Sequence, residues 1–130
     1  MEQKRISELS EIARNVRIGI IDAVHSASSG HPGGSLSSAD ILTYLYFEEL
    51  NIDPKNPADP LRDRFVLSKG HISPGLYSVL AHRGYFPVEH LKTFRKSDSN
   101  LQGHPDTKKV PGVDMSTGSL GQGVSIAVGM

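Results

Sequence analysis

The segment "RFVLSKGHISPGLYSVLAH", residues 64–82, contains the pattern that decides the fold class. Residues 64–67 form a short, mostly apolar run of strand length, and the run leads into a Gly-His pair. A helix is expected from Ser73 to about His82. A strand that leads into a loop and then a helix is typical of an α/β domain whose ligands bind at the strand ends. The sequence therefore predicts an α/β fold with at least one short parallel strand.

Helices are expected before this segment. Near the start of the chain, apolar residues recur at spacings of three and four, which predicts an amphipathic helix that stops between Ser28 and Gly34. Ser37 followed by Asp40 resembles a helix N-cap with an acid in the first turn, so a second helix is expected to about Glu49. The prediction of the first helix is based on these apolar positions: Ile6, Leu9, Ala13, Val16, Ile20 and Val24.

The second half of the chain is expected to contain less regular structure. After Gly84, "FPVEHLKTFRK" predicts another short helix with Pro87 near its first position. Residues 97–119 are expected to form loops. The last stretch, "STGSLGQGVSIAVGM", has no charge, indicates the start of a buried helix and shows no stop signal after Met130. We therefore expect the chain to be the front part of something larger.

Composition excludes several classes of protein. The chain has 130 residues, enough for about one domain, and its 14 basic residues equal its 14 acidic residues. No charge excess favours nucleic acid or an acidic membrane surface as a partner. The absence of cysteine excludes a disulfide framework and a cysteine-based zinc site. With no apolar run of membrane-spanning length, the expected setting is the cytoplasm.

Three of the 6 histidines directly follow a glycine: His31, His71 and His104. Prolines follow His31 and His104, and the residue before a proline is pushed away from helical backbone, so both histidines should lie on stiff loops. Glycine beside them allows a ligand to approach closely. Imidazole can donate, accept or carry a proton near neutral pH. The pattern predicts that three loops form the walls of one pocket.

Each histidine also has a structural interpretation. The His31 segment can be a simple turn, His71 can cap the following helix, and His104 can be an exposed loop residue. A zinc site built from the three is conceivable, although their spacings match no compact ligand motif and no ligating carboxylate is evident. The remaining histidines fall within predicted helices and are interpreted as structural: His25, His82 and His90.

A second candidate motif is "TGSLGQG", residues 117–123, at the expected start of a helix. Free N–H groups and the helix dipole make such a position suitable for a phosphate. The motif is not a Walker loop and does not have Gly-x-Gly-x-x-Gly spacing. Alternatively, Gly121 and Gly123 simply permit close helix packing.

Four segments together resemble the N-terminal part of a transketolase, most closely the N-terminal subunit of split-gene transketolases. They are "SGHPGGSLSSADILTYLY", "DRFVLSKGHISPGLYSVLAHRGYF", "LQGHPD" and "VDMSTGSLGQGVSIAVGM". The resemblance spans residues 5–130. It implies that residues 1–130 are an incomplete diphosphate-binding domain of a thiamine diphosphate-binding fold. Deoxyxylulose phosphate synthases are also similar, but they usually lack the His-Pro pair found here at His31.

The resemblance implies a reaction and a set of roles. Transketolases use thiamine diphosphate to move a two-carbon ketol unit between sugar phosphates. In that family the residue matching His31 lies beside the reacting carbons and helps in proton transfer, and the residue matching His104 contacts the terminal hydroxyl of the donor. The residue matching His71 bonds the cofactor diphosphate, while those matching Gly118 and Leu120 touch the cofactor.

The same resemblance also implies missing parts. The family's Gly-Asp-Gly segment with its downstream asparagine, which binds magnesium, is absent from these residues, as is the domain whose glutamate activates the cofactor. We therefore expect the Mg²⁺ ligands to lie outside this chain, and activity to need a C-terminal portion or subunit within a homo-oligomer of the complete enzyme. Alternatively, the chain is a non-catalytic fragment that acts as an association or phosphate-binding module.

Overall fold

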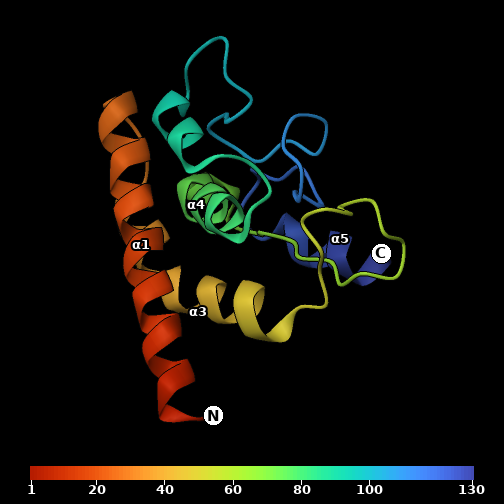
Figure 1. The fold of residues 1–130 in the computed structure, drawn as a ribbon. Coiled ribbons are helices and arrows are strands. Elements are labelled where there is room, and N and C mark those ends of the chain that lie inside the picture. The colour runs from red at the N-terminus through yellow and green to blue at the C-terminus, as the bar shows by residue number, and fades with distance from the viewer.

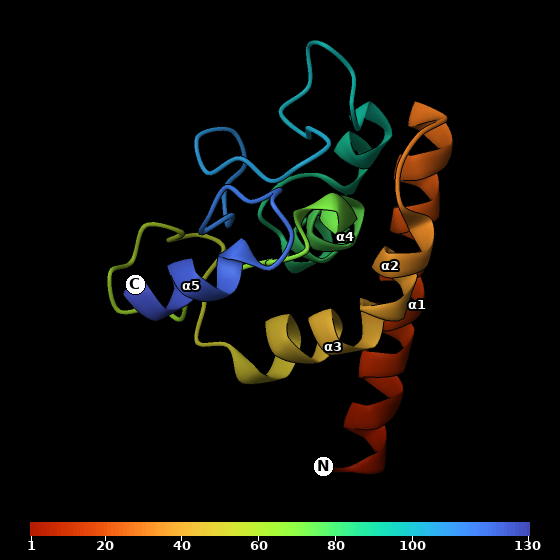
Figure 2. The same cartoon turned by 180° about the vertical axis from the view of Figure 1, so that it is seen from behind.

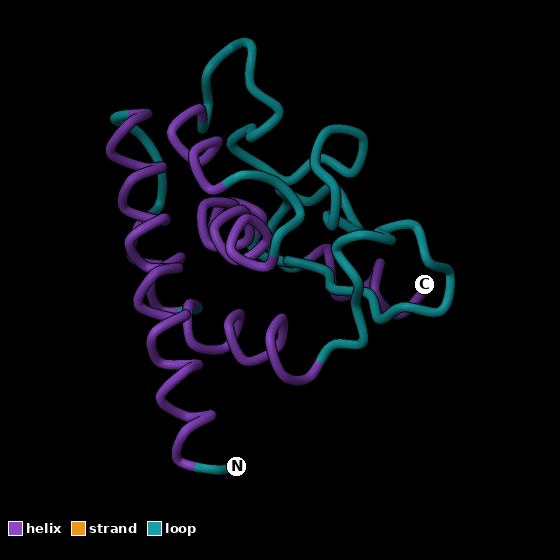
Figure 3. Tube along the Cα trace, viewed as in Figure 1, coloured by secondary structure: helices purple, strands orange, loops and turns teal.

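The computed structural model describes residues 1–130, and all of its regular structure is helical (Figure 1). Coloured by secondary structure, the chain shows only helices and loops (Figure 3). In chain order the elements are α1 (Gln3–Ala27), α2 (Pro32–Ser37), α3 (Ala39–Tyr44), the π-helical turn η1 (Leu45–Glu49), the 3-10 turn η2 (Gly70–Ile72), α4 (Ser73–Arg83), the 3-10 helix η3 (Val88–Thr93) and α5 (Gln122–Gly129).

Helix α4 forms the centre of the fold. It contacts α1, α2, α3 and η3, while α5 lies on the side away from α1 in both views (Figures 1 and 2). Every residue from Ser73 to Ala81 is buried, as expected for a helix that is apolar or small on all sides. Close contact with α1 is made at Ser78, whose hydroxyl donates a 2.7 Å hydrogen bond to the Val16 carbonyl. The buried central helix therefore directly follows the turn η2, which contains the Gly-His pair.

The amphipathic first helix is confirmed as α1. Its buried face consists of small and branched residues at helical spacing: Ala13, Val16, Gly19, Ile20 and Ala23. The helix ends at Ala27, and Ser28 takes a left-handed conformation (φ 48°) that satisfies the last carbonyls. The stop at residues 28–34 was therefore predicted correctly from the glycines and Pro32.

The prediction of a single second helix from Ser37 is wrong in its start. Pro32 begins a separate helix, α2, because a proline at the first helical position loses no hydrogen bond there. Ser37 is the last residue of α2, and its hydroxyl donates to the Gly34 carbonyl at 3.0 Å. Helix α3 starts at Ala39 without a side-chain cap.

The predicted parallel strand is not confirmed, because the structure contains no strand. The Phe65 amide donates to Asp114 Oδ2 at 2.7 Å, and the Leu67 carbonyl accepts from Thr117 Oγ1 at 2.7 Å. These backbone groups bind side chains of a distant loop, and no strand lies beside them to pair with. Within residues 1–130 the predicted α/β class is therefore not confirmed.

The remaining predictions vary in outcome. The helix expected from Ser73 to about His82 is confirmed as α4, and residues 97–119 contain no helix, as expected. The short helix expected after Gly84 is the 3-10 helix η3. None of the helices combines the length and apolar composition needed to cross a bilayer.

Candidate functional site

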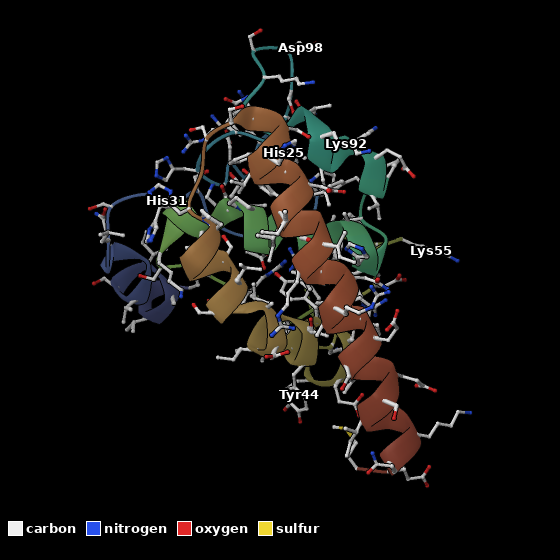
Figure 4. All side chains as sticks on the ribbon, turned by 90° about the vertical axis from the view of Figure 1, so that its left-hand side faces the viewer. His25, His31, Tyr44, Lys55, Lys92 and Asp98 are labelled. Carbon is white, nitrogen blue, oxygen red and sulfur yellow. The ribbon has the colours of Figure 1, made fainter.

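The loops of His31 and His71 lie against each other. The two imidazole rings stand edge to face, with centroids 5.1 Å apart and planes at 78°. A side chain at Gly34 would come within 2.7 Å of Ile72 Cγ2, so α2 packs directly on η2. Figure 4 shows His31 at the N-terminal end of α2, whereas His25 lies on α1.

The Gly-rich segment, residues 117–123, lies beside the loop of His71. A Cβ atom at Gly70 would lie 2.7 Å from the carbonyl carbon of Thr117, so only glycine permits this approach of the two backbones. The Thr117 hydroxyl also donates to the Leu67 carbonyl. These contacts fix the Gly-rich segment beside the loop of His71.

His104 completes the arrangement from a third loop. An ideal Cβ atom at Gly118 would lie 3.3 Å from Cδ2 of the His104 ring. The loop is held from below by α4: the Ser73 hydroxyl donates to the Gly103 carbonyl at 2.8 Å, and the Tyr77 hydroxyl lies 3.1 Å from the His104 carbonyl. Burial raises the pKa of Tyr77 well above its ordinary value, so this phenol stays protonated and remains a donor.

Three separate approaches thus bring these loops near one another: the His31 ring contacts the His71 ring, Gly70 lies against Thr117, and Gly118 lies against the His104 ring. Helix α4 follows the His71 turn directly and holds the His104 loop through Ser73 and Tyr77.

Leu120 differs from the other site residues predicted from the sequence. It lies two positions after Gly118, but its side chain is 70% exposed.

The His71 imidazole has a buried polar atom without a partner. Its Nδ1 makes no hydrogen bond, although the great majority of buried polar atoms in proteins have one. The capping alternative is not observed, because α4 has no side-chain cap. The hydrogen bonds within this chain therefore leave Nδ1 of His71 unsatisfied.

An ion pair that the sequence analysis missed fastens the loops under the site. Arg62 donates to the Asp114 carboxylate, and the two side chains are only 9% and 3% exposed. The hydrogen bond between the two side chains raises the pKa of Arg62 above its ordinary value. The second carboxylate oxygen accepts the Phe65 amide. Asp114 thus ties the segment before His71 to the segment before Thr117.

No group of three or more histidine, aspartate or glutamate side chains is placed to hold a metal ion. The prediction that the three histidine loops wall one pocket is not confirmed, because no hollow is lined by more than one of these histidines. A hollow of about 250 Å³, lined by residues that include Phe86, His90 and Lys109, contains none of them, and His104 lines a different hollow together with Asp106 and Lys108.

Neighbouring loops that present imidazoles beside a glycine-rich segment before a helix define a class of site suited to a phosphorylated ligand. Residues 9–130 match a family model described as transketolase, thiamine diphosphate binding domain. The chain belongs to the transketolase family, within its thiamine diphosphate-binding domain.

Similar proteins include two subunits of divided enzymes and a solved structure. A 6-deoxy-6-sulfo-D-fructose transketolase subunit from Clostridium sp. (strain MSTE9) is 47% identical over 100% of this chain and 47% of its own length. An apulose-4-phosphate transketolase subunit from Actinobacillus succinogenes is 46% identical over 95% of this chain and 45% of its own. A Pichia stipitis transketolase in complex with sedoheptulose 7-phosphate is 42% identical with a TM-score of 0.89, over 93% of this chain and 18% of that one.

The chain thus spans just under half of these two subunits and about a fifth of the undivided transketolase.

Replacing Gly70 with alanine should destabilise the fold by about 1 to 3 kcal/mol, because the new methyl group would overlap the Thr117 backbone. Urea unfolding of the purified chain measures this change. Gly33→Ala is the matched control, since no atom lies within 4 Å of its Cβ position. Equal stability of the two variants would contradict the close approach at Gly70.

Proposed function

We propose that this chain is the N-terminal portion of a transketolase, which transfers a two-carbon ketol unit between sugar phosphates with thiamine diphosphate. The observation that carries the proposal is that the His31 ring contacts the His71 ring, Gly70 lies against Thr117 and Gly118 lies against the His104 ring, in a chain of this family. Residues 1–130 would then be part of the diphosphate-binding domain, with the remainder of the enzyme supplied by further sequence or by a second subunit.

The residues present suit the diphosphate end of the cofactor. His71 has a buried ring nitrogen without a partner, and Gly118, which lacks a Cβ, lies close to the His104 ring. His71 would hold the diphosphate, while Gly118 and Leu120 would contact the cofactor near its diphosphate and aminopyrimidine. When bound, thiamine diphosphate supplies the carbanion chemistry that no amino-acid side chain provides.

His31 and His104 are proposed to act on the donor sugar. Both side chains are exposed in this chain, and they come from different loops of one site. His31 would move a proton to or from the donor hydroxyl next to the bond that breaks. His104 would donate a hydrogen bond to the terminal hydroxyl, and either imidazole can stabilise a developing alkoxide because it is already in place.

The partners of the site are also proposals. Because this chain spans only part of its relatives, a C-terminal portion or subunit would add the Mg²⁺ ligands and complete a homo-oligomer. Three apolar side chains around α5 are exposed and suit contact with that portion: Leu120, Val124 and Val128. Substrates with an anionic end fit the names of the two subunit relatives. The cysteine-free composition agrees with a cytoplasmic location.

The test is reconstitution. The chain, extended to the length of its subunit relatives, is mixed with a C-terminal transketolase subunit, thiamine diphosphate and Mg²⁺, and ketol transfer from a ketose phosphate to an aldose phosphate is measured. We expect turnover with the mixture and no micromolar binding of the cofactor by residues 1–130 alone in isothermal titration. An inactive mixture of correctly folded subunits would contradict the proposed reaction, and tight cofactor binding by the chain alone would contradict the missing anchor.

A further inference from the structure

Arg95 lies between the loops that carry two of the site histidines. Its Nη1 donates a 2.5 Å hydrogen bond to Ser29 Oγ, two residues before His31. The other edge of the guanidinium packs against Gly103. A Cβ atom added to Gly103 would lie 3.0 Å from Nε and 3.1 Å from Nη2 of Arg95. Gly103 directly precedes His104. One side chain therefore contacts both loops at once.

The backbone is left-handed on both sides of this contact. Only two residues other than glycine have positive φ, and they are Arg95 (61°) and Ser28 (48°), the neighbour of Ser29. This conformation is unfavourable for every residue with a side chain. A glycine at position 95 would adopt this conformation without strain.

The surroundings hold the guanidinium in this orientation. The Arg95 amide donates to the Leu101 carbonyl at 2.8 Å, which closes the short loop between them. The guanidinium carbon lies 5.5 Å from the centre of the ring of Phe94, a residue that is 1% exposed. Arg95 forms no ion pair with any carboxylate. Its role is therefore not charge neutralisation within the chain.

We propose that Arg95 is a positioning residue that fixes the separation of the His31 loop (residues 28–31) and the His104 loop (residues 101–104). The consequence for catalysis rests on the proposed function, in which both imidazoles act on one donor sugar. Arg95 contacts neither imidazole, and it acts through Ser29 and Gly103. A planar guanidinium suits this task because one edge can bond a hydroxyl while its other edge packs on a glycine.

The first experiment measures amide hydrogen exchange in the purified 130-residue chain. Arg95→Gly removes the side chain and relieves the strained backbone, while Ser29→Ala removes only the hydroxyl. Lys92→Ala is the charge control, since Lys92 is an exposed cation without a side-chain hydrogen bond. We expect Arg95→Gly to speed exchange about five- to tenfold in both loops and Ser29→Ala to do so in the His31 loop only. Lys92→Ala should match the unchanged chain.

Exchange that stays at the level of the Lys92→Ala control in either loop of Arg95→Gly would overturn the proposal. Thermal unfolding of the same variants separates positioning from general stability. Because the glycine relieves strain, the Tm of Arg95→Gly should stay equal or rise. A Tm that falls together with faster exchange throughout the chain would mean a merely structural role, and would also overturn the proposal.

The second experiment measures kinetics in the complete enzyme. Arg95→Gly should lower kcat about five- to tenfold with a phosphorylated donor and equally with an uncharged ketose donor, because both imidazoles are misplaced. The double variant with Ser29→Ala should be no slower than Arg95→Gly alone. A loss confined to the phosphorylated donor would mean that Arg95 binds the substrate anion directly, which would overturn positioning. If the unchanged enzyme transfers no ketol group, the proposed function fails, while the exchange experiment still decides the role of Arg95.

Discussion

Replacing His31 with alanine in the complete enzyme is expected to lower kcat by about two to three orders of magnitude without unfolding the protein. The imidazole is exposed, and its ring packs against that of His71. The backbone carbonyl of His31, which accepts the Ser35 hydroxyl at 3.0 Å, is unchanged by the substitution. Removal of the ring would therefore take away the proposed proton transfer to the donor and leave the packing of α2 intact.

Steady-state kinetics and thermal unfolding of the same samples test this prediction. His25→Ala is the matched control, because His25 is an exposed histidine on α1, outside the site. It should leave both kcat and Tm at their original values. His104→Ala should lower turnover or weaken donor binding, again with the loop retained by the Tyr77 hydroxyl at the backbone carbonyl. Equal losses of Tm in the His31 and His104 variants, with unchanged kinetics of the folded enzyme, would contradict a catalytic role for either ring.

The helices were predictable from the sequence where the local pattern and the packing agree. In α1 the residues at helical spacing from Ala13 to Ala23 are buried, and left-handed Ser28 ends the helix where expected. In α4 the run of small and apolar residues is longer than a typical strand, which favours a helix. The run at Phe65 and Leu67 has a strand's composition as well, but a strand requires a neighbouring strand, and here their backbone groups bind Asp114 and Thr117 instead.

The histidines of the site were predictable from the sequence, but the residues that hold their loops in place were not. A Gly-His pair is a local signal, because the glycine permits the close approaches seen at Gly70 and Gly103. Asp114 and Tyr77 gave no such signal. Each acts on a segment far away in the sequence, Asp114 on the Phe65 amide and Tyr77 on the His104 loop, and such pairings exist only after the chain has folded.

Asp114 has a larger structural role than any other acidic residue of the chain. Its carboxylate accepts from Arg62 and from the Phe65 amide, and Arg64 Nη1 lies 3.7 Å away. The Asp114 side chain is 3% exposed and that of Arg62 is 9% exposed. Without the carboxylate, the Phe65 amide and Nη2 of Arg62 would lose their partner, although Arg62 would keep its bonds to the Pro57 and Asp63 carbonyls.

Asp114→Ala is therefore expected to lower the free energy of unfolding by about 3 to 5 kcal/mol, the usual cost of breaking a buried ion pair from one side. Urea unfolding of the purified chain measures this loss. Asp40→Ala is the matched control: it removes an exposed pair with Arg17, whose N–O distance is 2.6 Å and whose side chains are 73% and 38% exposed, and it should cost at most about 1 kcal/mol. Because Asp114 ties the segment before His71 to that before Thr117, its variant should also expose both segments to protease. A loss no larger than that of Asp40→Ala would mean that the loops under the site are held by Thr117 and Gly70 alone.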